Sequence, residues 1–351
     1  MTEVQRELGK VGVLFAFSGG PFAEAVENLE GVETLVLGLK GGMDVNPVTI
    51  WRAVRFMSEY DIVHLHSINY VLVAAALIAR RKIIYTFHGL THLRRKLSVK
   101  DKFKLACLGL FVNNFFHALT ANSHFMEHEA RKFLGIKKDV RVIYNITPEA
   151  PAVLKEKSKL RYDLGIEEDE SLALTYSRIV HNKRIDLLLE AASLLKERGV
   201  QNIKVLIIGD GPHKPILIKK VSALNLEKRV SLMPFTKNIF DYVYAADFCV
   251  FPSHHEPFGI VALEALSLGK PVVVMKDGGG LVEVIGAVAD ARYVAHDVED
   301  LADKIEDLVQ NPEMLSQDSQ EFINRSKDFE SSRIAGQYGE VYTRALRGNG
   351  K

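Results

Sequence analysis

The sequence predicts an α/β protein of two domains, each built on a doubly wound parallel sheet. Short apolar runs alternate with helical patterns along almost the whole chain, as in strand–helix–strand units. With 351 residues, 47% of them hydrophobic, the chain is long enough for two cores. The pattern breaks near Pro148 to Lys159, so we predict domains at 1–150 and 151–330 and a terminal helical segment at 331–351.

The composition excludes several classes of protein. A net charge of +1 argues against a protein built mainly to bind nucleic acid, although residues 1–150 carry 19 Lys and Arg against 14 Asp and Glu. The first ten residues lack a signal-peptide pattern, and the longest apolar run, Tyr70 to Ala79, is too short to span a bilayer. Cys107 and Cys249 stand alone in apolar contexts, which suits buried thiols in a reducing compartment. We therefore expect a cytoplasmic protein.

In the first domain, apolar or β-branched runs predict strands, and amphipathic segments between them predict helices. Strands are expected at 11–17, 34–37, 61–66 and 82–87, and helices at 22–29, 47–60, 71–79 and 103–116. The first strand ends in a Gly19-Gly20 turn that lacks the Gly-x-Gly-x-x-Gly fingerprint, so a dinucleotide cofactor is not expected. His88 follows the strand 82–87, at the end where such sheets bind ligands, although a lone histidine there is more often structural.

The second domain opens with a charged strand-to-helix loop. Arg178 and Lys183 lie five residues apart between the strand 171–176 and the helix 185–196, so both cations can converge on a diphosphate. A solvated surface loop is the alternative. The next strand, 204–208, runs into a Gly209-Asp210-Gly211-Pro212 turn, which is common between any strand and helix.

A strand–loop–helix–strand unit at 247–275 carries two carboxylates. Glu256 lies in the loop before the helix and Glu264 lies two turns inside it. Between them, the amides of Phe258, Gly259 and Ile260 open the helix, where unpaired N–H groups favour a phosphate. Either carboxylate alone would be interpreted as a solvated residue or as a charge that complements the helix dipole.

Taken together, this unit resembles the Glu-x7-Glu signature of retaining glycosyltransferase family 4, the glycosyl transferases group 1. Its members have the GT-B fold, in which two Rossmann-like domains face a cleft. The resemblance covers nearly the whole chain and is strongest from Ser171 to Val284. It implies closing strands of the first domain at 118–123 and 140–145, and a last helix at 332–346 that returns to that domain.

The resemblance also implies roles for single residues. Arg178 and Lys183 match the pair that binds the leaving diphosphate, Glu256 the residue that holds the sugar, and His88 the active-site histidine. Glu264 matches the residue that holds the donor ribose. The remaining donor-binding positions are Gly19, Gly20, Gly211, Phe258, Gly259 and Ile260.

Two departures from the family pattern bear on these expectations. The family usually has Asn-Gly after the strand 140–145, whereas Asn145 is followed by Ile146 here. The glycine that usually follows the lysine is replaced by Arg184, which either narrows the loop or adds a contact.

The expected function is transfer of a hexosyl group, with retention, from a nucleoside diphosphate sugar to a hydroxyl of a glycan, glycolipid or small molecule. The sequence has no Asp-x-Asp pair and no zinc-spaced Cys or His cluster, so neither a metal nor a further cofactor is implied. A GT-B nucleotide-sugar epimerase and a non-catalytic GT-B binding subunit are the alternatives. The donor base and the acceptor stay open.

A basic segment predicts a peripheral contact with a membrane. Between Arg80 and Lys104 lie nine Lys or Arg and one Asp, and the apolar helix 103–116 follows. A basic stretch beside an amphipathic helix is typical of interfacial binding. A solvated loop that leads into a core helix is the alternative.

Overall fold

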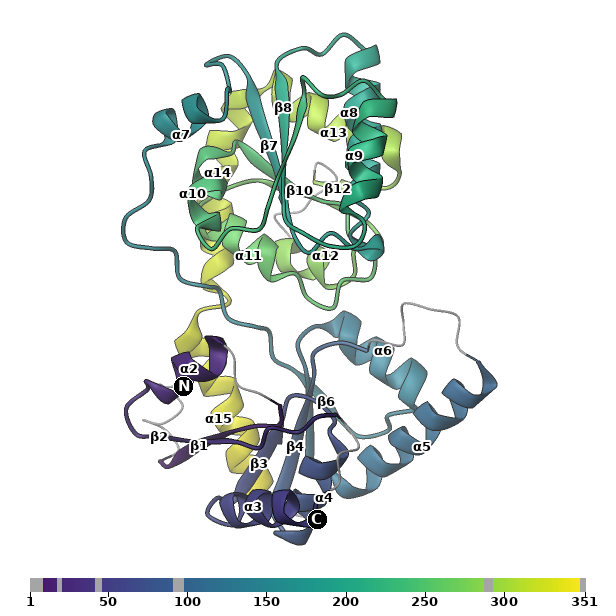
Figure 1. Ribbon diagram of the computed structural model, residues 1–351, viewed down its shortest axis with the longest axis vertical. Coiled ribbons are helices and arrows are strands. Elements are labelled where there is room, and N and C mark those ends of the chain that lie inside the picture. Colours follow the sequence, from purple (N-terminus) through teal and green to yellow (C-terminus); the bar gives the residue numbers. More distant parts are fainter. Residues whose placement is uncertain (1–8, 18–20, 42–45, 91–97, 287–292, 348–351) are drawn as a thin grey trace. The chain divides into compact units, whose positions relative to one another are not determined.

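The computed structural model describes residues 9–17, 21–41, 46–90, 98–286 and 293–347, in two compact units (Figure 1). The first unit comprises residues 1–144 and 331–351, and the second comprises 145–330. Every pair of neighbouring strands is parallel. The predicted α/β class is confirmed. Gly19 and Gly20 lie outside the described residues.

The first unit alternates strands with helices. In chain order its elements are β1 (Val11–Phe15), α2 (Pro21–Glu27), β2 (Val32–Val36), α3 (Pro47–Met57), β3 (Ile62–Leu65), α4 (Tyr70–Ile78), β4 (Lys82–Phe87), α5 (Val99–Phe115), β5 (Ala118–Ala121), α6 (His124–Leu134), β6 (Val140–Val142) and α15 (Ser331–Arg347). Strands β1 and β2 form one pair, and the other four follow the order β3-β4-β5-β6.

Helix α15 packs within this unit although it ends the described chain. Its Ile334 and Val341 share an apolar cluster with Ile84 of β4 and Ile143. Glu340 pairs with Arg141 of β6. This last helix, far from the other elements in the sequence, thus belongs to the same core and buries its apolar face there.

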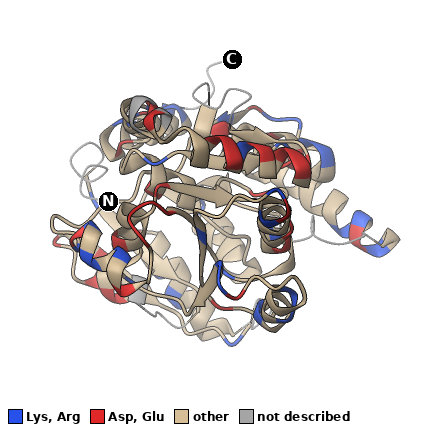
Figure 2. Ribbon diagram, turned by 90° about the horizontal axis from the view of Figure 1, so that it is seen from above, with Lys and Arg blue, Asp and Glu red and all other residues tan. Residues whose placement is uncertain are grey.

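Helix α5 begins at Val99, four residues before the predicted start at Phe103, because Ser98 and Asp101 form a capping box at its N-terminus. Lys residues therefore lie on its first turns, where Figure 2 shows them in blue at the right. Cys107 on this helix is exposed, so the prediction of two buried thiols is wrong for Cys107 and right only for Cys249. No helix within the described ranges is long and apolar enough to cross a bilayer.

The second unit holds a six-stranded sheet. Its elements are α7 (Lys157–Asp163), β7 (Ser171–Tyr176), η2 (His181–Lys183), α8 (Ile185–Glu197), β8 (Ile203–Ile208), α9 (Lys214–Ala223), β9 (Val230–Met233), α10 (Ile239–Ala245), β10 (Phe248–Phe251), α11 (Ile260–Ser267), β11 (Val272–Met275), α12 (Gly280–Ile285), β12 (Val294–Ala295), α13 (Val298–Gln310) and α14 (Pro312–Lys327).

The strand order of this sheet indicates where a ligand is expected to bind. The order is β12-β11-β10-β7-β8-β9, so the chain winds one way from β7 and the other way from β10. In open α/β sheets, ligands bind outside the carboxyl ends of the strands at the point where the winding reverses. That point lies between β7 and β10, the two strands whose following loops carry Arg178, Lys183 and Glu256.

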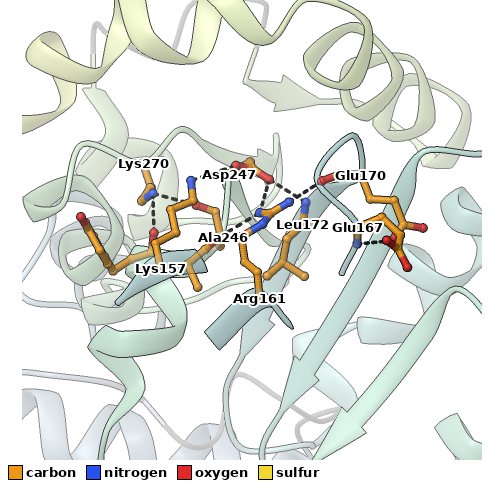
Figure 3. Close-up of polar contacts among 10 residues, drawn as sticks. Lys157, Arg161, Glu167, Glu170, Leu172, Ala246, Asp247 and Lys270 are labelled. Atoms are coloured by element: carbon orange, nitrogen blue, oxygen red, sulfur yellow. Dashed lines mark hydrogen bonds and ion pairs between the residues drawn. The ribbon is translucent and has the colours of Figure 1, made fainter. Parts of the chain in front are cut away.

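The opposite, amino end of the same sheet is tied together by charged side chains that we call the amino-end cluster: Lys157, Arg161, Asp247 and Lys270 (Figure 3). The carboxylate of Asp247 accepts hydrogen bonds from Leu172 N at 2.8 Å, from Arg161 Nη1 at 2.8 Å and from Lys157 Nζ at 3.2 Å. The cluster thereby fixes α7 against the starts of β7 and β10.

The cations of this cluster also bind backbone oxygens. Arg161 donates to the carbonyls of Ala245 and Glu170, and Lys270 donates to those of Tyr244 and Ala246 at 2.8 and 2.7 Å. A cavity of about 550 Å³ lies beside them, lined in part by α14. Burial, with a smaller effect of Lys157, lowers the pKa of Lys270 to about 8.

Candidate functional site

Three loops meet at the carboxyl end of the second unit's sheet. They follow β7, β10 and β11, and backbone hydrogen bonds join them. His254 N donates to Asn182 O at 2.8 Å, which links the first loop to the second. Glu256 N donates to Gly278 O at 3.1 Å, and Gly280 N donates to Glu256 O at 2.8 Å, which links the second to the third. The backbone of Glu256 is therefore held from both sides.

The two central charged residues of the prediction are in direct contact. Lys183 Nζ lies 2.7 Å from Glu256 Oε2, and each side chain is only 16% exposed. They come from loops more than 70 residues apart in the chain. The ammonium group has three N–H donors, so it can hold Glu256 and still donate to a ligand oxygen.

Arg178 lies on the same loop and is exposed. Within the described parts of the chain, its guanidinium has no ion-pair or hydrogen-bond partner. The Gly209–Pro212 turn packs directly on this loop: Ile179 N donates to Asp210 O at 2.9 Å. Gly211 has φ +159°, and a Cβ there would lie 2.2 Å from Ile179 O, so only glycine permits this approach.

The start of α11 presents backbone rather than side chains. Phe258 is 2% exposed, and its ring packs against Phe329, with centroids 6.0 Å apart, so its side chain is not available to a ligand. Gly259 caps the helix with φ +104°, and a Cβ there would lie 2.3 Å from Leu281 Cδ2. The amides of Gly259 and Ile260 donate to no other described residue. They form an anion-binding helix start.

Glu264 lies in the second turn of α11 and is half-buried. Burial raises the pKa of its carboxyl group, and the nearby Tyr176 hydroxyl offsets part of that rise. Tyr176 ends β7, and its hydroxyl donates to Val261 O at 2.8 Å. Glu264 therefore lies beside the end of β7, on the same edge of the sheet as Arg178.

The replacement of the family's glycine by Arg184 adds a contact. Arg184 has the left-handed conformation that glycine favours, with φ +45° and ψ +38°. Its guanidinium pairs with both carboxylate oxygens of Asp277 and donates through Nε to Pro252 O at 3.0 Å. The side chain bridges the loops after β7, β10 and β11 and so compensates for the strained backbone.

In the first unit, His88 follows β4 and lies beside a second histidine. His88 Nε2 is 2.8 Å from Nδ1 of His66, which follows β3. Asn122, after β5, donates to His88 O at 3.3 Å. Burial, with a contribution from His66, lowers the pKa of His88 to about 4, so its ring is neutral at pH 7. The neighbouring His64 of β3 is held by Tyr342 and Thr86.

The structure thus brings Arg178, Lys183, Gly211, Glu256 and the start of α11 to one edge of one sheet. His66 and Asp277 were missed, since neither has a distinctive spacing in the sequence. The one signal for His66 was its place at a strand end, next to that of His88. Among the described residues, no group of three or more His, Cys, Asp or Glu side chains could hold a metal ion.

Comparison with known proteins identifies the family. Residues 156–328 match the model for Glycosyl transferases group 1, and residues 3–148 match that for Glycosyltransferase Family 4. N-acetyl-alpha-D-glucosaminyl L-malate synthase of Bacillus anthracis is 28% identical over 306 residues, which cover 83% of this chain and 77% of that protein. An uncharacterized glycosyltransferase of Methanocaldococcus jannaschii is 30% identical over 239 residues, which cover 65% of this chain and 60% of that protein.

Solved structures agree with this at the level of the fold. Anabaena HepE, crystallised with UDP and glucose, superposes with a TM-score of 0.79 at 22% identity, covering 97% of this chain and 94% of that one. A glycosyltransferase of Rickettsia africae has the same TM-score at 19% identity, with coverage of 99% and 94%. The chain therefore belongs to the group 1, or family 4, glycosyltransferases and has their GT-B fold.

Proposed function

We propose that this glycosyltransferase moves a hexosyl group from a nucleoside diphosphate sugar to an acceptor hydroxyl and retains the anomeric configuration. The contact between Lys183 and Glu256, at the switch point of the second unit's sheet, carries this proposal. It sets a cation and a carboxylate side by side where a ligand binds, so the cation can meet the donor's diphosphate while the carboxylate meets the sugar hydroxyls.

The leaving diphosphate is stabilised by the chain itself in this proposal. Arg178 has a guanidinium free of described partners, Lys183 keeps N–H donors beyond its bond to Glu256, and the α11 amides point along a helix dipole. Preorganised donors of this kind stabilise charge that develops on a leaving group. The reaction then needs no metal and no cofactor besides the donor substrate.

Further residues contribute to the proposed donor site. Glu264 accepts hydrogen bonds from the ribose hydroxyls, and the tight Gly211 turn lies beside the nucleotide. His88 contributes a neutral imidazole from the first domain. We also propose that Gly19 and Gly20, as the resemblance to the family implies, bind the donor.

The donor and acceptor classes follow from what relatives are named for. HepE was crystallised with UDP-glucose, and the malate synthase is named for joining N-acetylglucosamine to malate. A D-inositol 3-phosphate glycosyltransferase of Xylanimonas cellulosilytica is 31% identical over 157 residues, 43% of this chain and 37% of that one. UDP-sugars are therefore the first donors to test, with small hydroxy acids, inositol phosphates and lipid-linked sugars as acceptors.

Donor turnover tests the proposal. The purified chain is incubated with UDP-, GDP- and ADP-sugars, with and without each acceptor, in the presence of either chelator or magnesium. We expect nucleoside diphosphate release that requires an acceptor and survives chelator, and a product whose anomeric proton coupling matches the donor. Acceptor-independent release with a changed sugar would instead show an epimerase, and a complete lack of turnover would reject a transferase.

We also propose that the protein contacts an anionic membrane surface through α5 and the basic segment from Arg80 to Lys104. Val99, Phe103 and Leu110 are 85, 69 and 64% exposed and fall on one stripe of α5, since they are four and seven residues apart. Lys100, Lys102 and Lys104 are exposed beside them. Arg94, Arg95 and Lys96 of the same segment lie outside the described residues.

Vesicle sedimentation tests this contact. We expect the native chain to pellet with anionic vesicles at low salt, and less at high salt, because each cation near such a surface contributes on the order of 1 kcal/mol. Changing both Phe103 and Leu110 to Ser should weaken binding. Changing Ile216 and Ile218, exposed apolar residues of α9, to Ser is the matched control. Equal binding by both double variants would remove α5 from the contact.

A further inference from the structure

The pair formed by His66 and His88 restricts where each ring can carry its proton. His66 Nδ1 and His88 Nε2 are 2.8 Å apart, and the two rings lie at 27° with centroids 5.1 Å apart. Burial lowers the pKa of each ring, to about 4 for His88, although His66 is partly exposed to solvent. At pH 7 each ring therefore has one N–H and one lone pair.

Only two arrangements of those protons make the bond between the rings. In the first, His66 donates from Nδ1, so the lone pair of His88 is on Nε2 and its proton is on Nδ1. In the second, His88 donates from Nε2, so His66 accepts on Nδ1 and carries its proton on Nε2. Because the contact joins Nδ1 of one ring to Nε2 of the other, both rings hold the same tautomer in either case.

We infer that His66 is a positioning residue that sets the tautomer of His88. When a ligand oxygen accepts a hydrogen bond from His88 Nδ1, His66 supplies the N–H that occupies Nε2. When a ligand hydroxyl donates to His88 Nδ1, His66 accepts the N–H of Nε2. Within the described residues, His88 Nδ1 has no other partner. The pair thus presents a neutral donor or a neutral acceptor and moves no net charge.

A buried network holds the ring of His66 in place for this role. His64, two residues earlier on β3, has its ring centroid 4.3 Å from that of His66. Both nitrogens of His64 are occupied, at 2.7 Å from the Tyr342 hydroxyl of α15 and at 2.7 Å from the Thr86 hydroxyl of β4. A side chain whose two nitrogens are both fixed cannot rotate freely, so His66 rests against a rigid surface.

The role of the pair toward a substrate rests on the proposed function, but the shared tautomer does not. Imidazole nitrogen shifts, measured by long-range proton–nitrogen NMR on chain labelled at histidine, report the tautomer of each ring without any substrate. Signals are assigned from the spectra of His66→Phe and His88→Phe. We expect His66 and His88 to show the same tautomer in the native chain. Opposite tautomers would overturn the inference.

Substitutions of His66 then test whether it positions the ring of His88 or only supports the fold. His66→Phe keeps a ring but removes the bond, so we expect the tautomer of His88 to change or become mixed and kcat to fall about tenfold, with little change in the donor KM. His66→Asn places an amide nitrogen close to the position of Nδ1 and should restore the single tautomer of His88 and most of kcat. A His66→Phe variant with native kcat and a native His88 tautomer would contradict the inference.

These outcomes also separate this inference from the proposed function. Equal tautomers in a native chain that transfers no sugar would reject the proposed function and keep the role of His66. Sugar transfer by a native chain with opposite tautomers would keep the proposed function and reject the role of His66.

Discussion

The two ends of the second unit's sheet carry the same kinds of charged residue but differ in how much hydrogen-bonding capacity they leave unused. At the amino end, Asp247 accepts three hydrogen bonds, and Arg161 and Lys270 also donate to main-chain carbonyls. At the carboxyl end, the guanidinium of Arg178 has no partner among the described residues, and the ammonium of Lys183 has only Glu256 there. The first arrangement holds the fold together, whereas the second can receive a ligand.

This difference shows that a perturbed pKa or a cavity does not by itself identify a functional site. Lys270 has a pKa lowered to about 8, mainly by burial, and it borders a cavity of about 550 Å³. Yet its ammonium is held by Tyr244 O and Ala246 O, and the neighbouring cations are paired with Asp247. Structural ion-pair networks shift pKa values as active sites do. Two features decide whether a charged cluster is structural or binds a ligand: its place in the sheet topology, and whether its donors lack partners.

Removing the carboxylate of the amino-end cluster should have the largest effect. Asp247→Ala leaves Arg161, Lys157 and the Leu172 amide without their acceptor, so we expect the free energy of unfolding at pH 7 to fall by about 3 kcal/mol. Turnover per folded molecule should stay unchanged. Urea denaturation and a turnover assay at a temperature where both chains are folded provide the measurements.

The loss of stability in Asp247→Ala should also depend on pH. Burial raises the pKa of Asp247, but the Leu172 amide, Lys157 and Arg161 outweigh it and leave the pKa below its usual value. The folded chain then binds fewer protons than the unfolded chain, so this stability is present above pH about 3.9 and is lost as the pH falls through the folded pKa. The difference between native chain and variant should narrow with acidification. A difference that grows in acid would show that Asp247 is not held as a carboxylate.

The carboxyl end should respond in turnover rather than in stability. Lys183→Ala removes a cation from the proposed diphosphate site, so we expect turnover to fall about 100-fold, as on removal of one oxyanion donor. Lys157→Ala is the matched control, because Lys157 pairs with Asp247 at the other end of the sheet. Comparable losses of turnover in both variants would erase the distinction between the two ends.

A third substitution tests whether Glu264 belongs to the donor site. Glu264→Gln keeps the shape but removes the charge, so we expect the Kd of the nucleoside diphosphate to rise about tenfold, which corresponds to about 1.4 kcal/mol. Isothermal titration gives the value, with Glu227→Gln, exposed in the same unit, as control. An unchanged Kd would remove Glu264 from the donor site.

The pH dependence of that variant has the opposite sign to that of Asp247→Ala. Burial raises the pKa of Glu264, so the folded chain keeps this proton to a higher pH than the unfolded chain does. The stability contributed by Glu264 therefore falls as the pH rises from about 4.3 through the folded pKa. Relative to the native chain, Glu264→Gln should gain stability over that window. A constant difference across it would mean that burial does not perturb this carboxyl.

The sequence predicted most of the second unit because its signals are local. The strand β7 has the predicted bounds, and β8 begins one residue before its predicted start, since each is a short apolar run between glycine, proline or charged residues. The contact between Lys183 and Glu256 could be anticipated only through the resemblance to a known family, because spacing along the chain does not encode which loops of a sheet meet.

Other features could not be predicted from the sequence, because they depend on side-chain packing that a pattern of residues does not encode. The amide of Phe258 was expected at the donor site, but its ring lies in the core and the residue as a whole is only 2% exposed. The start of α5 was missed because the capping box of Ser98 and Asp101 precedes the apolar residues on which the prediction relied. The pairing of His66 with His88 depends on the register of β3 against β4, which alternation of apolar residues does not fix.

The smallest effect concerns Arg184 and Asp277, a charged pair at the carboxyl end whose hydrogen-bonding groups are engaged much as those of the amino-end cluster are. Arg184 bonds to Asp277 and Pro252 O while its backbone stays left-handed, with φ +45°. Arg184→Ala loses those bonds and keeps the strain, whereas Arg184→Gly loses the bonds and relieves the strain. We expect the Gly variant to be more stable than the Ala variant by about 1 kcal/mol, the cost of a left-handed conformation for a residue with a Cβ.

Urea denaturation of the two variants beside the native chain measures this difference, and turnover of each shows whether the bridge also serves catalysis. If Arg184 only joins the three loops, both variants keep turnover within about threefold, because neither change removes a group from the proposed diphosphate site. Equal stability of the Ala and Gly variants would mean that the loop relaxes once the side chain is gone. The guanidinium would then impose the left-handed backbone. Arg184 would create this conformation itself, rather than occupy a position whose backbone suits glycine.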